Sequence, residues 1–216
     1  MPSDYPVQFT VDYPDRQLAR VSSAFRIFTV IPIAIVLGAL GSGSFGWGDS
    51  SWSDNGRSTS SHSAMGGVGL LVLPPLLMIL FRRKYPRWWF DWNFNVMSFS
   101  NRVCVYGLLM TDVYPATDEE QSSHLELPYP DVTSDLNRWL PLVKWLLAIP
   151  HYIVLFFLFV GVLVSAVIAW FAILFTGRFP RGLFDYIAGV LRWGNRVVAY
   201  AYVLTTDAYP PFSLSE

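Results

Sequence analysis

The sequence contains the same pattern twice, and this duplication limits the folds that the chain can adopt. One copy begins at Lys84 and reads KYPRWWFDW, and the other begins at Arg178 and reads RFPRGLFDY. Further along each copy, the sequence Thr-Asp-x-Tyr-Pro begins at Thr111 and again at Thr206. A repeat of this length is typical of one structural unit that is used twice. We therefore predict two repeats, which occupy residues 1–118 and 119–216.

The two copies also match towards their starts. The first reads FTVDYP from Phe9, and the second reads LELPYP from Leu125. Arg26 then corresponds to Lys144. The first copy is longer because it contains an additional segment, residues 41–67, that is rich in Gly and Ser. Such a composition does not build a packed core, so we expect a flexible loop there.

The composition indicates a membrane protein. Hydrophobic residues make up 53% of the chain and charged residues only 14%, whereas soluble domains usually carry about 25% charged residues. The net charge of −1 gives no electrostatic basis for binding nucleic acid. Cys104 is the only cysteine, which excludes an intrachain disulfide, and the histidines lack the spacing of metal ligands. The charged start of the chain does not resemble a secretory signal peptide.

Three apolar tracts are candidates for membrane insertion: Ile27–Leu40, Val68–Phe81 and residues 145–177. The third contains no charged residue, and as one straight helix it would be about 50 Å long, against about 30 Å for a hydrocarbon core. The polar loop interrupts the first copy at the corresponding point. We therefore predict a helical hairpin with its turn near Phe159–Gly161, and four short spans in total. Arms this short either cross a thinned bilayer or enter and leave on one side.

Basic residues flank both ends of each predicted hairpin. They are Arg20, Arg26, Arg82, Arg83, Lys84 and Arg87 in the first copy, and Arg138, Lys144, Arg178 and Arg181 in the second. By the positive-inside rule these ends face the cytoplasm, and so do both termini. Because both repeats then run from inside to inside, we expect the axis that relates them to lie along the membrane normal.

Each hairpin is followed by a segment with the pattern of an amphipathic helix that lies in the cytoplasmic interface. Charged residues fall within one narrow arc of the helical wheel. They are Arg87, Asp91 and Arg102 in the first copy, and Arg181, Asp185, Arg192 and Arg196 in the second. We interpret them as candidate contacts for anionic lipid headgroups or for a partner protein. The alternative is that they only anchor a solvated helix face.

The repeated aspartates, Asp112 and Asp207, have two interpretations. They could form a pair of carboxylates across the axis between the repeats. Turn and cap chemistry also explains an Asp in this context without any functional role. The short segments Val7–Val11 and Leu125–Leu127 alternate weakly, and we expect them to be extended and to pair with each other or with the C-terminal segment.

The sequence contains no pattern of catalytic, cofactor-binding or metal-binding residues. It has no Gly-rich phosphate loop, paired-cysteine motif or HExxH motif. Many serines and His62 lie in the Gly/Ser-rich loop, where no rigid scaffold would hold a catalytic triad. The lack of charge within the apolar tracts argues against an ion-coupled transporter. We therefore expect a protein that is not an enzyme and that needs neither a metal nor a cofactor.

The second copy resembles a known family. It includes the stretch FTGRFPRGLFDY from Phe175 and the stretch RWGNRVVAYAYVLTTDAYPPFSL from Arg192. Over about residues 125–214, the chain closely resembles a bacterial membrane family known as a domain of unknown function (DUF4389). The first copy matches more loosely. The resemblance implies a bacterial integral membrane protein, and it supplies no catalytic residues.

These patterns predict an all-α protein of the bacterial inner membrane, built from two pseudo-repeats. Each repeat is a short transmembrane hairpin followed by an amphipathic interfacial helix, with minor extended segments on the cytoplasmic side. The expected function is that of an accessory or scaffold subunit that contacts membrane lipids, a membrane-protein partner or a second copy. The alternative is a carrier or channel for a lipid or a small hydrophobic molecule, which needs a cavity between the repeats. A membrane enzyme would need the two aspartates to meet in a water-accessible pocket.

Overall fold

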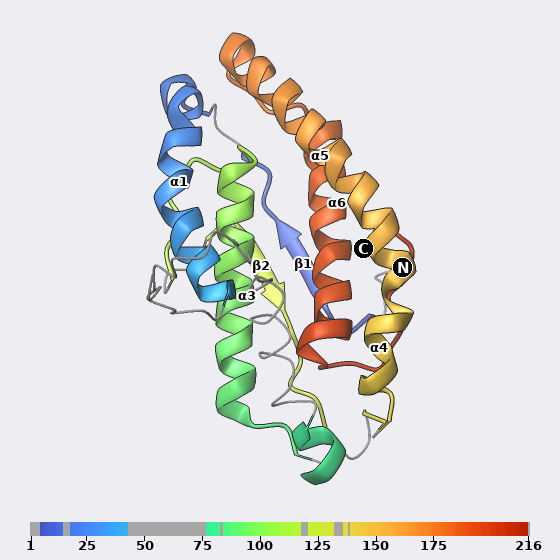
Figure 1. Cartoon of the computed structure of the whole chain (residues 1–216). Coiled ribbons are helices and arrows are strands. Elements are labelled where there is room, and N and C mark those ends of the chain that lie inside the picture. The colour runs from blue at the N-terminus through green and yellow to red at the C-terminus, as the bar shows by residue number, and fades with distance from the viewer. Residues whose placement is uncertain are drawn as a thin grey trace, which may run out of the picture.

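The computed structural model describes residues 5–14, 18–42, 77–82, 84–117, 121–131, 136–137 and 139–215 (Figure 1). The α-helices are α1 (Arg20–Ser42), α3 (Arg87–Gly107), α4 (Pro141–Leu147), α5 (Ile149–Thr176) and α6 (Arg181–Val198). Two short π-helical segments are η1 (Met78–Arg82) and η2 (Ala199–Val203), and the strands are β1 (Gln8–Val11) and β2 (Ser123–Glu126). The prediction of a largely helical chain with minor extended segments is therefore confirmed.

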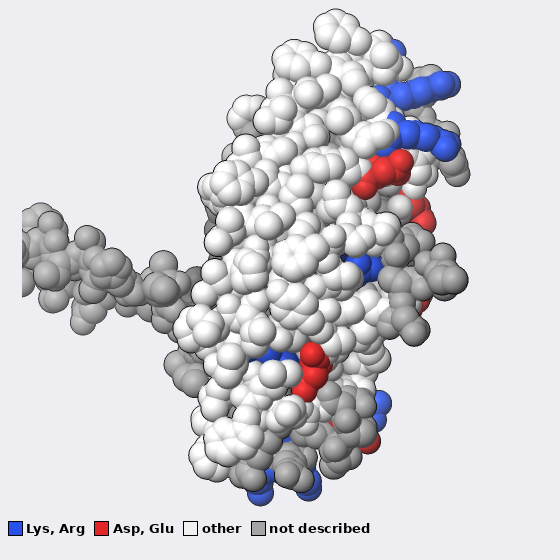
Figure 2. All heavy atoms as spheres, turned by 90° about the vertical axis from the view of Figure 1, so that its right-hand side faces the viewer, with Lys and Arg blue, Asp and Glu red and all other residues white. Residues whose placement is uncertain are grey.

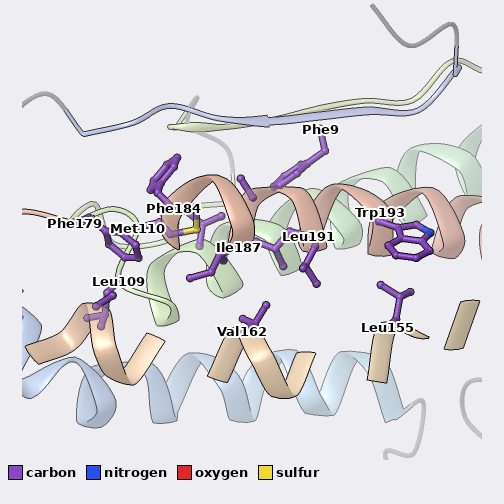
Figure 3. Packing of buried hydrophobic residues seen from close by; sticks show 14 of the residues in the cluster. Phe9, Leu109, Met110, Leu155, Val162, Phe179, Phe184, Ile187, Leu191 and Trp193 are labelled. Atoms are coloured by element: carbon purple, nitrogen blue, oxygen red, sulfur yellow. The ribbon is translucent and has the colours of Figure 1, made fainter. Parts of the chain in front are cut away.

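The elements form three layers. The β1–β2 ribbon lies on one side, α3 and α6 form the middle layer, and α1 and α5 form the layer on the opposite side (Figure 1, Figure 3). α5 packs against α6, and α1 packs against both α3 and α5. β1 contacts α6 and β2 contacts α3. α1 and α5 are thus the outermost helices on the face away from the ribbon.

The ribbon joins the two halves of the chain. β1 and β2 are antiparallel, and Phe9 lies opposite Leu125. These are the residues at which the matching patterns FTVDYP and LELPYP begin. Val7 and Phe9 are buried, whereas Gln8 and Thr10 are exposed, so one face of β1 packs on the helices and the other is open. Of the two pairings expected for the extended segments, with each other or with the C-terminal segment, the structure shows the first.

Gly177 and Pro180 fix the turn in which the chain reverses its direction between α5 and α6. Gly177 ends α5 with a φ of 72°, and its N–H donates to the carbonyl oxygen of Ile173 at 2.8 Å. This left-handed cap suits glycine because L side chains rarely adopt it. Pro180 immediately precedes α6, as Pro86 precedes α3. Their fixed φ suits a helix start, so α6 begins promptly and runs back along α5.

The main core lies between α5, α6 and the ribbon. Leu155 and Val162 point from α5 towards α6, where Ile187 and Leu191 meet them (Figure 3). Phe9 of β1 covers the opposite side of α6. Full burial of an apolar side chain of this size contributes about 1.5–3 kcal/mol. The core therefore fixes α5 against the middle layer.

The hairpin predicted within the third apolar tract is wrong. α5 continues without a break through Phe159–Gly161. A single glycine is tolerated inside a helix, and Gly161 has another role, because a Cβ there would collide with the Tyr186 hydroxyl of α6. That hydroxyl donates to the carbonyl oxygen of Leu158 at 3.0 Å. The glycine thus permits close contact between α5 and α6. Because the second copy contains no hairpin in this tract, which the structure describes throughout, it does not provide two of the four short spans that were predicted.

The structure describes only part of the segments predicted for the first copy. α1 covers the tract Ile27–Leu40. Most of the Gly/Ser-rich loop, residues 41–67, and of the tract Val68–Phe81 lies outside the described residues, and so does the hairpin predicted there. Among the described helices, α5 alone is long and apolar enough to cross a membrane, by length and composition.

Candidate functional site

In the first half, Arg26 is held in the interior by α3 and the segment that follows it. Its Nη2 forms an ion pair with Asp112, and its Nη1 donates to the carbonyl oxygen of Thr111 at 2.6 Å. The guanidinium carbon lies 4.5 Å from the ring centroid of Tyr106. Asp112 also accepts a hydrogen bond from the N–H of Ala19 at 2.8 Å. Because only 1% of Arg26 is exposed, these contacts are needed to offset the desolvation of its charge.

The second half has the same arrangement around Lys144. Its Nζ lies 2.6 Å from Asp207 Oδ1 and donates to the carbonyl oxygen of Thr206 at 2.7 Å. It also lies 5.1 Å from the ring centroid of Tyr200, and Asp207 accepts from the N–H of Asn137. Burial lowers the pKa of Lys144, and the hydrogen bond and ion pair with Asp207 act in the opposite direction. Asp207 therefore helps the buried amine to stay protonated.

The two repeated aspartates each have a basic partner. Among the contacts of the described residues, those of Asp112 run to Arg26 and Ala19, and those of Asp207 to Lys144 and Asn137. No contact between the two carboxylates is among them. In both copies the preceding Thr hydroxyl accepts a hydrogen bond from the N–H two residues on. The threonine bonds are those of a local turn, whereas the ion pairs of the two aspartates with Arg26 and Lys144 were part of neither interpretation.

Three arginines of the predicted charged arcs bind backbone carbonyl oxygens. Arg192 donates to those of Phe9 and Leu214, at 2.8 and 3.0 Å. Arg196 is buried and donates to another carbonyl of the C-terminal segment at 3.3 Å. Arg102 donates to a carbonyl of the segment after α3 at 2.7 Å. These side chains hold β1, the C-terminal segment and the segment after α3 in place.

The other charged residues of the arcs are exposed. They are Arg87 and Asp91 near the start of α3, and Arg181 and Asp185 near the start of α6. The guanidinium of Arg181 lies 4.8 Å from the ring centroid of Tyr13, and that of Arg87 lies 5.8 Å from that of Tyr129. In each case the tyrosine comes from the other half of the chain. These four residues stay candidate contacts for lipid headgroups or a partner.

An amide pair that sequence reasoning did not single out lies between α3 and α6. Asn101 and Asn195 exchange two hydrogen bonds, at 2.9 and 3.0 Å, and both are buried. Asn195 Nδ2 also donates to the carbonyl oxygen of Leu191 at 3.0 Å. An amide nitrogen has two protons, and the described residues supply an acceptor for one of those of Asn101. The available signal was the sequence Asn-Arg-Val, which occurs once in each copy.

An apolar groove of about 660 Å³ adjoins this amide pair. Its walls come from α3 of the first half and from α5, α6 and η2 of the second, and they include Met97, Cys104, Tyr152, Phe156, Gly194 and Val198. None of the described residues that line it is charged. The volume falls within the range of about 300–1,000 Å³ that is usual for ligand pockets. The sequence could not reveal it, because apolar helix residues do not show which distant helix they face.

The helices α1, α4 and α5 carry many exposed apolar side chains. Examples are Phe28 and Ile35 of α1, Trp145 of α4, and Phe157, Leu163 and Phe175 of α5. Figure 2 shows the side with α4 and α5, where uncharged residues cover most of the surface and charged residues gather mainly along one edge. Only 22% of the most apolar window of α5 is buried inside the molecule. α5 therefore differs from a core helix, which would be mostly buried.

The described residues include no group of three or more His, Cys, Asp or Glu side chains that could hold a metal ion. Residues 139–213 match a family model described as Domain of unknown function (DUF4389). The resemblance expected for the second copy is confirmed over these residues, which include α4, α5, α6 and η2. Comparisons with curated proteins and with solved structures gave no significant match.

Proposed function

We propose that this chain is a non-enzymatic protein of the bacterial inner membrane, in which α1, α4 and α5 contact lipid and the β-ribbon faces the cytoplasm. The observation that carries the proposal is the difference between the two outer layers. Large apolar side chains are exposed on one, and polar side chains are exposed on the other. The protein serves as an accessory or scaffold subunit that organises lipid or a membrane partner.

The exposed surface of α5 supports contact with lipid. Soluble monomers rarely expose a contiguous apolar patch larger than a few hundred Å². On α5, large apolar side chains are exposed from Ile149 to Phe175, over nearly the whole helix. Transfer of such surface out of water contributes about 25 cal/mol per Å². Placing this surface in the bilayer therefore removes an unfavourable contact with water.

The ribbon supports insertion from one side only. β1 and β2 lie beside the middle layer and expose polar residues, among them Gln8, Thr10 and Glu126. The ribbon contains no further described strand, so its outer edges carry backbone groups that a hydrocarbon environment does not satisfy. If α5 crossed the bilayer upright, the ribbon would lie at the same depth. We therefore propose that α5 lies along the membrane and that both of its ends stay at the cytoplasmic face.

The matching contacts support two repeats around a pseudo-two-fold axis. Phe9 faces its counterpart Leu125, and Asn101 bonds to its counterpart Asn195. The ion pairs of Arg26 and Lys144 also correspond. Such an axis passes through the ribbon pair and through the amide pair, which lies between α3 and α6 of the middle layer. Figure 3 shows the ribbon on one side of that layer and α5 on the other, so the axis runs across the layers. With that face in lipid, the axis lies along the membrane normal.

Membrane insertion is tested by the pair of variants Leu163→Asp and Thr10→Asp. Both residues are exposed, Leu163 on the outer face of α5 and Thr10 on the ribbon. A soluble protein tolerates both changes, whereas an Asp in hydrocarbon costs up to about 2.5–3.5 kcal/mol. We expect the wild-type chain and Thr10→Asp to stay in the membrane pellet after alkaline carbonate extraction, and Leu163→Asp to be partly released. Release of the wild-type chain would contradict the proposal.

A lipid carrier is a second candidate function, and the groove favours it. The cavity lies between α3 of the first half and helices of the second half, which is the position that a carrier built from two repeats requires.

A further inference from the structure

We propose that the groove between α3 and the α5–α6 pair binds the acyl chain of an uncharged membrane lipid of the diacylglycerol type. The ester carbonyl or the hydroxyl group of the lipid lies near the Asn101–Asn195 pair. This inference rests on the proposed function, because the bilayer that α5 contacts is the source of the ligand.

The walls of the groove are continuous with the face that contacts lipid. Phe156 and Phe159 of α5 line the groove, and both are also exposed on the outer layer. The opposite wall is α3, which contributes Val96, Met97 and Cys104. A lipid chain can therefore enter sideways from the bilayer without passing through water. This continuity favours a lipid over a water-soluble ligand.

The lining selects against a charged ligand. Among the described residues, no Asp, Glu, Lys, Arg or His lines the groove. A fatty-acid carboxylate within the groove would have no basic side chain to pair with, and an unpaired charge in an apolar site is costly. A phosphate group would meet the same difficulty. The groove therefore fits a lipid whose polar groups are neutral.

The polar groups of the groove fit a neutral oxygen. Asn101 and Asn195 line it, and the described residues supply an acceptor for only one of the two amide protons of Asn101. Tyr152 and Ser100 add hydroxyl groups to the lining. An ester carbonyl can accept the remaining amide proton of Asn101, which a buried donor requires. The ligand that satisfies both the apolar walls and this donor is an uncharged acylglycerol.

Cys104 allows the site to be tested in the unmodified chain. It is the only cysteine, and it lines the groove. We would measure the rate at which a maleimide labels Cys104 in phosphatidylcholine nanodiscs that contain dioleoylglycerol or oleate as a minor component. Dioleoylglycerol at ten times its dissociation constant should slow labelling about tenfold, and oleate should leave the rate unchanged. Equal protection by the two lipids would overturn the neutral-ligand assignment, and no protection by dioleoylglycerol would overturn the site.

A matched pair of glycine variants tests the location. A Cβ at Gly194 would meet only the ring of Phe159, at 3.8 Å, whereas a Cβ at Gly182 of the same helix meets nothing within 4 Å. Gly194→Leu should fill the groove, and Gly182→Leu should leave it open. With a photoreactive diazirine analogue of dioleoylglycerol, we expect crosslinks to groove peptides of α3 and α6 in the wild type and in Gly182→Leu, and about tenfold fewer in Gly194→Leu. Equal crosslinking in all three would overturn the groove assignment.

The two proposals fail in different ways. If Gly194→Leu stays in the carbonate pellet and still crosslinks fully, the groove is wrong and membrane insertion stands. If the wild-type chain leaves the pellet while dioleoylglycerol still protects Cys104, the groove stands and membrane insertion is wrong. Protection of Cys104 before any dioleoylglycerol is added would overturn the diacylglycerol assignment, because a phosphatidylcholine chain, a protein segment or a second copy would then fill the groove.

Discussion

The variant Asp207→Asn should unfold with a free energy about 3–5 kcal/mol lower than that of the wild-type chain. The change removes the carboxylate that pairs with Lys144, whose exposed fraction is 0%, and leaves a charge unpaired in the interior. In the variant, the unpaired Lys144 binds fewer protons in the folded than in the unfolded state as the pH rises. The stability of the variant therefore increases with pH, and its difference from the wild-type chain becomes smaller. Thermal and denaturant unfolding in detergent, followed by circular dichroism, would measure both effects.

Two further variants control this result. Asp185→Asn removes the same charge from an exposed position on α6, and it should change stability by less than about 0.5 kcal/mol. The double variant Lys144→Met, Asp207→Leu removes both charges, and it should recover most of the loss because replacement of a whole buried ion pair is often neutral. A single variant as stable as the wild type would show that the ion pair does not hold this part of the fold together.

The variant Gly161→Ala should destabilise the chain by about 1–3 kcal/mol, although alanine is the better helix former. A Cβ at this position collides with the Tyr186 hydroxyl and pushes α5 away from α6. It also disturbs the hydrogen bond from Tyr186 to Leu158. Unfolding in detergent would measure the loss.

Gly182→Ala is the matched control, because a Cβ there has open space around it. It should stabilise the chain by up to about 1 kcal/mol through helix propensity alone. Tyr186→Phe should restore part of the stability that Gly161→Ala loses, because it removes the colliding oxygen. If Gly161→Ala and Gly182→Ala stabilise the chain equally, the close contact between α5 and α6 is not present.

Local sequence signals predicted the ends and types of several elements. Pro86 and Pro180 are local signals of this kind, because they immediately precede α3 and α6 and a proline is favoured where a helix begins. The duplicated segments at Phe9 and Leu125 indicated two strands, and the structure pairs them. These signals could be recognised because each depends on neighbouring residues, or on a direct match between the two copies.

Long-range contacts could not be predicted in the same way. The arginines Arg192 and Arg196 form part of a charged helix face in the sequence, but their partners are carbonyl oxygens of β1 and of the C-terminal segment. Gly161 was interpreted as part of a turn, since the sequence does not show that Tyr186 lies against it. The groove was missed because its walls come from both halves of the chain.

One-sided insertion is tested most directly by labelling the two ends of the α4–α5 helix pair. In a Cys104→Ser background, Asn137→Cys places a thiol before α4 and Arg178→Cys places one after α5, both at exposed positions. A membrane-impermeant maleimide is added to right-side-out and to inverted bacterial membrane vesicles. We expect both thiols to react only in inverted vesicles, because the proposed insertion places both ends of the pair at the cytoplasmic face. Labelling of the two thiols from opposite sides would contradict this account, because it would show that α5 crosses the bilayer.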